Sequence, residues 1–130
     1  MAHYQSFEDL EIWKKSREIC NDVYDLYLIS DLQKDYGLWN QLNRSTGSVM
    51  DNIAEGFDRD GNKEFIQFLS IAKASCGESK SQLYRCLDRK YVDQNKFLDI
   101  ASKMENCKAQ TAGSMKYLKK SDRKGKKYDI

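Results

Sequence analysis

Hydrophobic residues recur three or four positions apart along most of the chain, which is the spacing that places side chains on one face of an α-helix. The pattern is clearest in residues 38–57, where the apolar positions are Leu38, Leu42, Val49 and Ile53. Polar residues interrupt or border this face, namely Arg44, Ser45, Ser48, Asn52 and Glu55. Because a buried polar group is costly unless it has a hydrogen-bond partner, this helix is expected to need specific partners in its own bundle or in another subunit.

The same periodicity predicts three more helices, and the four together span about residues 6–29, 36–57, 62–91 and 94–119. The first has apolar positions at Leu10, Trp13, Cys20, Val23, Tyr24 and Tyr27. The third has a seam made of Phe65, Phe68, Leu69, Ala72, Cys76, Ser79, Leu83, Cys86 and Leu87. The fourth has heptad-like spacing with two polar lapses at Phe97, Ala101, Met104, Lys108, Thr111, Met115 and Leu118.

Polar residues that can cap helices precede each of these segments. Helix-capping side chains are expected at Ser6 with Asp9, at Asp31 or Asp35, and at Asp93. Residues 58–62 contain a turn glycine and further side chains that could cap the third helix. The connections are short, and short connections favour antiparallel neighbours.

The composition supports a helical fold. The chain has 130 residues, no proline and seven glycines, and 40% of its residues are hydrophobic. The absence of proline argues for long uninterrupted helices, and neither strand-like alternation nor an internal repeat is visible. The fold class is therefore all-α, an antiparallel up-down-up-down four-helix bundle over residues 1–119, followed by a basic tail at 120–130.

The charge is uneven along the chain. Residues 1–118 carry 16 Lys and Arg against 18 Asp and Glu, whereas residues 119–130 carry six against two. Such a tail can attract phosphate without sequence preference, or it can simply be solvated. No apolar run is long enough to span a membrane and no signal-peptide pattern is present, so a soluble, cytoplasmic protein is expected.

No residue pattern of an enzyme or of a metal site is apparent. There is no Gly-rich phosphate loop and no Glu-x-x-His pair, and the single histidine is His3, at the start of the chain. The four cysteines form no CxxC pair, so they are interpreted as small buried hydrophobic residues. Glu55 and Glu78 are the carboxylates nearest an apolar face, and without a clustered partner they are expected to be structural. We therefore expect no catalytic residue, no metal and no cofactor.

Basic residues make a nucleic-acid interface conceivable. Candidate contacts are Lys73, Lys80, Arg85, Arg89 and Lys90 in the third helix and Lys124, Lys126 and Lys127 in the tail. However, Lys73 and Lys80 project about 120° or more away from Arg85 and Arg89 on a helix. One subunit therefore lacks a single basic stripe, although a ring of subunits could concentrate these charges.

The stretch from Tyr36 to Arg59 carries a family resemblance. The matching residues are Tyr36, Gly37, Leu38, Gln41, Leu42, Arg44, Ser48, Asn52, Ile53, Ala54, Glu55, Gly56 and Arg59, and further on Lys63, Glu64, Phe65, Leu69, Ala72, Ser75, Glu78 and Leu83. In these residues the chain resembles the 23S rRNA intervening-sequence proteins, also called the S-twenty-three ribosomal protein family. The resemblance covers most of residues 6–118, and it departs from the family pattern at Met50 and Ala74, where proline and glycine are usual.

The resemblance implies a four-helix bundle that assembles as a homopentamer and has no catalytic activity. Some members are encoded within insertions in large-subunit ribosomal RNA genes, and a related protein is an accessory partner of a reverse transcriptase in diversity-generating retroelements. RNA, DNA or a reverse transcriptase is therefore the implied partner. Arg44, Asn52, Glu55, Arg59 and Glu78 are expected to fix the bundle or its neighbours. The alternative is a protein-only adaptor that docks a partner through exposed aromatic residues such as Tyr27, Trp39 or Tyr117.

Overall fold

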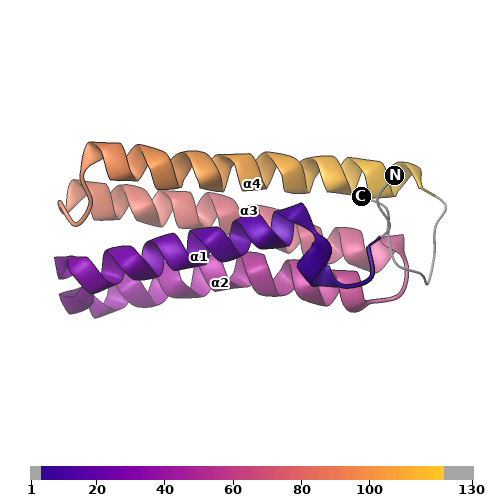
Figure 1. Cartoon of the computed structure of the whole chain (residues 1–130), viewed down its shortest axis with the longest axis horizontal. Helices are drawn as coiled ribbons and strands as arrows, with labels where there is room; N and C mark the ends of the chain where they lie inside the picture. The colour runs from indigo at the N-terminus through magenta and orange to yellow at the C-terminus, as the bar shows by residue number, and fades with distance from the viewer. Residues whose placement is uncertain (1–3, 122–130) are drawn as a thin grey trace.

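The computed structural model describes residues 4–121, and these residues form four long helices that alternate in direction (Figure 1). The elements are η1 (Phe7–Asp9), α1 (Glu11–Ile29), η2 (Asp31–Lys34), α2 (Tyr36–Asp58), α3 (Asn62–Asp88) and α4 (Gln94–Lys120). Helix α2 packs on α3, α3 packs on α4, and α1 lies against both α2 and α4. The predicted all-α four-helix bundle is confirmed, and the described residues contain no strand.

The first predicted helix is in fact two elements. A short 3-10 turn, η1, is separated from α1 by Leu10, whose extended backbone has φ −75° and ψ 130°. The expected capping box is present, because the Ser6 side chain accepts the N–H of Glu8 and the Asp9 carboxylate accepts the N–H of Ser6. The capping box therefore starts the 3-10 turn, and the buried Leu10 side chain anchors the start of α1.

The buried face of α1 differs from the predicted one. The residues that enter the core are Ile12, Ser16, Ile19, Val23 and Leu26. Of the predicted positions within the helix, only Val23 is fully buried, and Tyr24 is 51% exposed. The sequence carries two overlapping periodic sets one position apart, and the aliphatic set packs inward because branched apolar side chains have no polar group to satisfy.

The later helices follow their predicted apolar seams more closely. Leu38, Leu42, Val49 and Ile53 are at most 3% exposed, and Asp35 caps α2 by accepting the N–H of Leu38. Helix α3 ends at Asp88, three residues before the predicted end, because the chain turns at Lys90 with a positive φ of 64°. Asp93 caps α4 as predicted, by accepting the N–H of Lys96.

The predicted side-chain cap of α3 is wrong. The capping residue is Gly61, which has a φ of 94° and provides no side chain. The side chain of Asn62 instead reaches across the bundle, where its Nδ2 donates to the carbonyl oxygens of Leu118 and Ser121. This contact ties the start of α3 to the end of α4.

The core is a single cluster of aliphatic, aromatic and cysteine side chains. Cys76, Cys86 and Cys107 are buried, and burial raises the pKa of the Cys86 thiol to about 11. Among residues 4–121, no helix combines the length and the apolar character that a membrane-spanning segment requires.

Candidate functional site

Buried polar side chains join α2 to α3. The hydroxyl of Ser79 donates to Ser45 over 2.8 Å, and the hydroxyl of Ser45 donates to Oε1 of Gln82 over 2.6 Å. Each of these residues is at most 7% exposed. Ser45, a polar residue on the apolar face of α2, therefore has its hydrogen-bond partners within the same chain and needs none from another subunit.

The next turn of α2 continues this polar contact. The hydroxyls of Ser48 and Ser75 lie 2.9 Å apart across the two helices. Asn52 donates to the backbone oxygen of Ser48 over 2.8 Å and to its hydroxyl over 3.0 Å. Asn52 is thus hydrogen-bonded within its own helix and reaches α3 only through Ser48.

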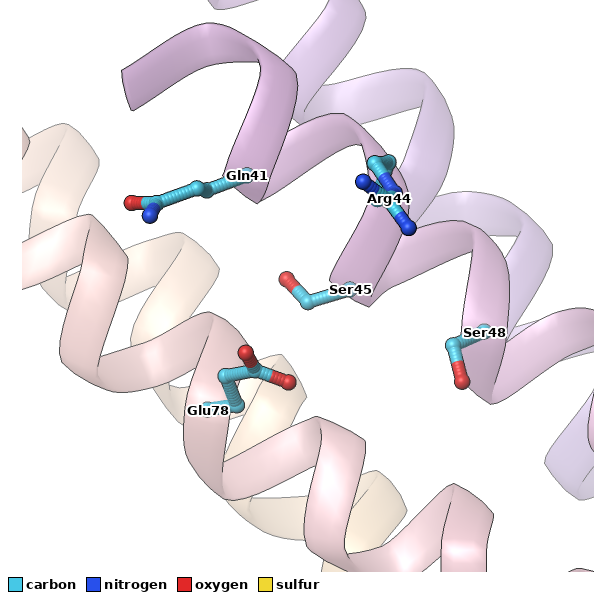
Figure 2. A pocket seen from close by; sticks show the side chains of 5 residues that line it. All are labelled: Gln41, Arg44, Ser45, Ser48 and Glu78. Carbon is cyan, nitrogen blue, oxygen red and sulfur yellow. The ribbon is translucent and has the colours of Figure 1, made fainter. Parts of the chain in front are cut away.

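A cavity of about 370 Å³ opens beside these serines, and Figure 2 shows its lining. The lining residues are Gln41, Arg44, Ser45, Ser48 and Glu78. Glu78 lies on α3, across the cavity from the α2 side chains (Figure 2). It receives only a long hydrogen bond of 3.4 Å, from Gln82. Arg44 is exposed and forms no hydrogen bond or ion pair with another described residue.

The cavity offers groups for binding but lacks a pair of groups for acid–base chemistry. Glu78 is its only carboxylate, and the hydroxyls of Ser45 and Ser48 are bonded to Gln82 and Ser75 and not to a basic group. Glu55 lies outside the cavity lining, so the two glutamates singled out from the sequence are not brought together. Within residues 4–121, no group of three or more His, Cys, Asp or Glu residues could hold a metal ion.

Glu55 and Arg59, which are four residues apart, form an ion pair. Their side chains lie 2.8 Å apart at the end of α2, and hydrogen bonding to Glu55 raises the pKa of Arg59. Arg59 also lies 3.7 Å from Glu64 and over the ring of Phe68. These contacts fasten the end of α2 to the start of α3, and Arg44 has no part in them.

The basic residues of α3 are engaged on two opposite flanks of the helix. Lys80 contacts Glu105 of α4 over 3.1 Å, whereas Arg85 donates to Gln41 of α2 over 2.8 Å. Arg89 pairs with Asp35 at the start of α2. This agrees with the angular separation that the sequence indicated, and it leaves these three side chains occupied by contacts within the chain.

The remaining sequence-predicted cations are scattered. Lys73 is half-buried on α3, and Lys90 is exposed in the connection between α3 and α4. Figure 1 shows that this connection and the end of α4 lie at opposite ends of the bundle. Lys124, Lys126 and Lys127 lie outside the described residues. The structure therefore does not gather those predicted cations that it describes into one surface.

A different group of lysines lies where α3 begins and α4 ends, and we call it the basic end. It consists of Lys63, Lys116, Lys119 and Lys120. All four are exposed, and none forms an ion pair or hydrogen bond with another described residue. Figure 1 shows that the α2–α3 connection and the end of α4 lie at the same end of the bundle. The contact of Asn62 with α4 brings the two segments together.

Sequence reasoning noted Lys63 and counted Lys119 and Lys120 with the tail, but it did not join them into one site. The contribution of α4 to the basic end was visible in the sequence, because lysines concentrate in the last turns of this helix. Their proximity to the start of α3 depends on the tertiary contact of Asn62, a residue that the sequence had suggested as a cap.

Comparison with known proteins gives a family match and a likeness in fold. The sequence model of the 23S rRNA-intervening sequence protein family matches residues 8–113. The chain is similar to the crystal structure of a protein with unknown function from the S23 ribosomal protein family of Bacteroides thetaiotaomicron VPI-5482. That similarity has a TM-score of 0.74 and 22% identity, and it covers 81% of this chain and 98% of that one, which shows the fold alone. No curated protein matches the chain.

Proposed function

The chain belongs to the 23S rRNA-intervening sequence protein family, and we propose that it is a non-enzymatic, self-associating protein that binds nucleic acid through its basic end. The observation that carries the proposal is that the four lysines of the basic end are exposed and without partners among the described residues. Unpaired lysines that displace the counterions of a phosphate backbone supply sequence-independent affinity. The paired cations of α3 would first have to give up Glu105, Gln41 or Asp35.

The distribution of charge supports this location. Of the 22 Lys and Arg and the 20 Asp and Glu, four and two respectively lie in residues 122–130. The described part of the chain thus carries 18 of each and has no net charge. Positive charge in excess is therefore confined to residues 119–130, and the tail lysines Lys124, Lys126 and Lys127 continue in sequence from the basic end.

The test is the salt dependence of binding to a labelled structured RNA and to a labelled DNA duplex. We expect replacement of Lys116, Lys119 and Lys120 by Ser to weaken binding and to reduce the slope of log K against log salt by about 2 to 3, since each phosphate contact contributes about 0.7 to 0.9. The matched control replaces Lys14, Lys34 and Lys96, which changes the net charge equally. Each of these three lysines lies in an i,i+3 ion pair.

Two outcomes would contradict the proposal. One is that neither nucleic acid binds in a salt-sensitive manner at low ionic strength. The other is that the control triple variant loses as much affinity as the basic-end variant, because binding would then follow net charge alone. A variant with Lys80 and Arg85 replaced serves as a further comparison. If it loses as much nucleic-acid affinity as the basic-end variant, the interface includes α3.

Self-association is supported by a group of stacked aromatic side chains from α1 and α2, which we call the aromatic patch. It consists of Tyr24, Tyr27 and Trp39, with ring centroids 4.3 Å apart between Tyr27 and Trp39. Tyr24 is 51% exposed. Tyr27 and Trp39 are half-buried against the core and are not exposed as the sequence suggested, so Tyr24 is the member of the patch that a second subunit could contact. Light scattering should give a mass several times 15.2 kDa, with the pentamer implied by the resemblance as the expected state.

The same aromatic patch supports the second candidate function, a protein-only adaptor. In that case the patch would dock a partner protein, such as a reverse transcriptase, and the lysines would only maintain solubility. A partner that stays bound after nuclease treatment and survives the basic-end substitutions would favour the adaptor. A partner released by either treatment favours binding through nucleic acid.

A further inference from the structure

A cavity of about 550 Å³ lies within the basic end, between the α2–α3 connection and the last turn of α4. Its walls include Ile66 of α3 and Leu118 of α4, which provide apolar surface. Lys63 and Lys119 lie at the same cavity, one from each helix. The cavity thus combines an apolar surface with two cations that have no partner among the described residues.

We propose that this cavity receives an unstacked base of a single-stranded nucleic acid while Lys63 and Lys119 contact the adjoining phosphates. The inference rests on the proposed function and specifies its substrate class. A base has apolar faces and is attached to charged phosphates, so it needs apolar walls next to cations. In a duplex the bases are stacked and paired, and only a single strand, a loop or a bulge can insert one without that cost.

Asn62 also lines the cavity and carries a further polar group. Its Nδ2 is used by the carbonyl oxygens of Leu118 and Ser121, which holds the side chain in place. Its Oδ1 is buried and has no hydrogen-bond partner among residues 4–121, although buried polar atoms are nearly always satisfied. Base edges carry N–H donors that match this acceptor, whereas phosphate groups carry none.

Asp60 also lines the cavity, and its carboxylate would repel a phosphate. The negative charge of Asp60 should therefore oppose binding, whereas the positive charges of Lys63 and Lys119 should favour it. Replacing Asp60 by Asn should strengthen single-strand binding at low salt, while replacing Lys63 and Lys119 by Ser should weaken it. If neither substitution changes single-strand affinity, the charged groups at the cavity do not act on the phosphates, and the inference is wrong.

The decisive experiment compares a labelled single-stranded oligonucleotide with a duplex of the same length, using the full chain. We expect the single strand to bind about tenfold or more tightly, because one accommodated base contributes about 1–3 kcal/mol. Ile66→Gln replaces an apolar wall of the cavity with a polar side chain that offers no ring for stacking, and it should bring single-strand affinity down to the duplex level without changing duplex affinity. The control is Ile71→Gln, the same substitution on the same helix at a side chain that is 49% exposed and outside the cavity.

A second measurement needs no variant of the protein. An oligonucleotide with an abasic backbone should bind about tenfold more weakly than the same length with bases. Equal affinity for single strand and duplex, or an abasic strand that binds unchanged, would overturn the inference while leaving salt-sensitive binding intact. Absence of any salt-sensitive binding would instead overturn the proposed function itself.

Discussion

The side chain of Asp35 links the start of α2 to the residues that follow α3. Its carboxylate accepts hydrogen bonds from the N–H of Leu38, from the hydroxyl of Tyr91 over 2.8 Å, and from Arg89. The hydrogen bond from Tyr91 and then that from Arg89 lower the pKa of Asp35. The carboxylate is therefore stabilised in its charged form where the start of α2 meets the end of α3.

A depressed folded-state pKa makes this contribution depend on pH. The stabilisation is fully present above the unfolded pKa of about 3.9 and is lost as the pH falls through the lower folded value. We expect Asp35→Ala to reduce the free energy of unfolding by about 1 kcal/mol at pH 7, chiefly through loss of the helix cap. The difference from the unsubstituted protein should shrink below about pH 4.

Thermal unfolding at pH 7 and pH 3 measures this prediction. Asp31→Ala is the matched control, because Asp31 is 76% exposed and its contact with Lys34 is 3.6 Å long. An Asp35 effect that is the same at both pH values, or no larger than the Asp31 effect, would show that the charged carboxylate is not the stabilising group.

At the scale of elements, α2 and α3 pack closely together at Gly56. A Cβ atom at this position would lie 2.7 Å from Cβ of Phe68 and 2.9 Å from Cδ1 of Phe65. The Phe65 ring in turn meets Phe57 edge-on, with centroids 6.0 Å apart. Only glycine allows the two helices to pack at this distance.

Gly56→Ala should therefore lower the free energy of unfolding by about 1–3 kcal/mol, the usual cost of overpacking. The control is Gly47→Ala in the same helix, where an added Cβ meets no atom within 4 Å. This substitution should raise stability by about 0.4–1 kcal/mol, because alanine restricts the unfolded chain. Urea unfolding measures the free energy of unfolding of both variants. If both substitutions change it by the same amount and in the same direction, the packing argument is wrong.

At the scale of the whole molecule, the outer surface of the described chain is divided by chemistry. The aromatic patch lies where α1 meets α2, while the basic end lies where α3 begins and α4 ends. The contacts between α1 and α4 include an ion-pair cluster in which Lys103 meets Glu18 and Asp22 at 2.8 Å each. Self-association and nucleic-acid binding can therefore be tested separately, because they are assigned to different surfaces.

The aromatic patch yields a prediction about assembly. Tyr24→Ser should weaken self-association by removing exposed aromatic area, while the melting temperature of the dissociated chain changes little. Light scattering over a dilution series measures the effect. Tyr84→Ser is the control, because Tyr84 is 48% exposed but lies on α3 against Phe97. If both variants weaken self-association equally, the aromatic patch is not the interface between subunits.

The sequence by itself determined the fold class, three of the four helix seams and the cap at Asp93, because helical periodicity and capping are properties of neighbouring residues. It offered Asp31 and Asp35 as alternative caps of α2, and the structure has Asp35. It was wrong about the inward face of α1 and about the cap of α3. In both cases several residues satisfied the local pattern, and packing against another helix selected among them.

Only the tertiary structure decided where the polar and charged residues act. The order and the rotation of the helices pair Ser45 with Gln82, Lys80 with Glu105 and Arg89 with Asp35, and these pairs are separated by 25 to 54 residues. A contact at such separation depends on the relative register of two helices, which no stretch of local sequence specifies. The same reason explains why the basic end emerged from the fold, although each of its lysines is plain in the sequence.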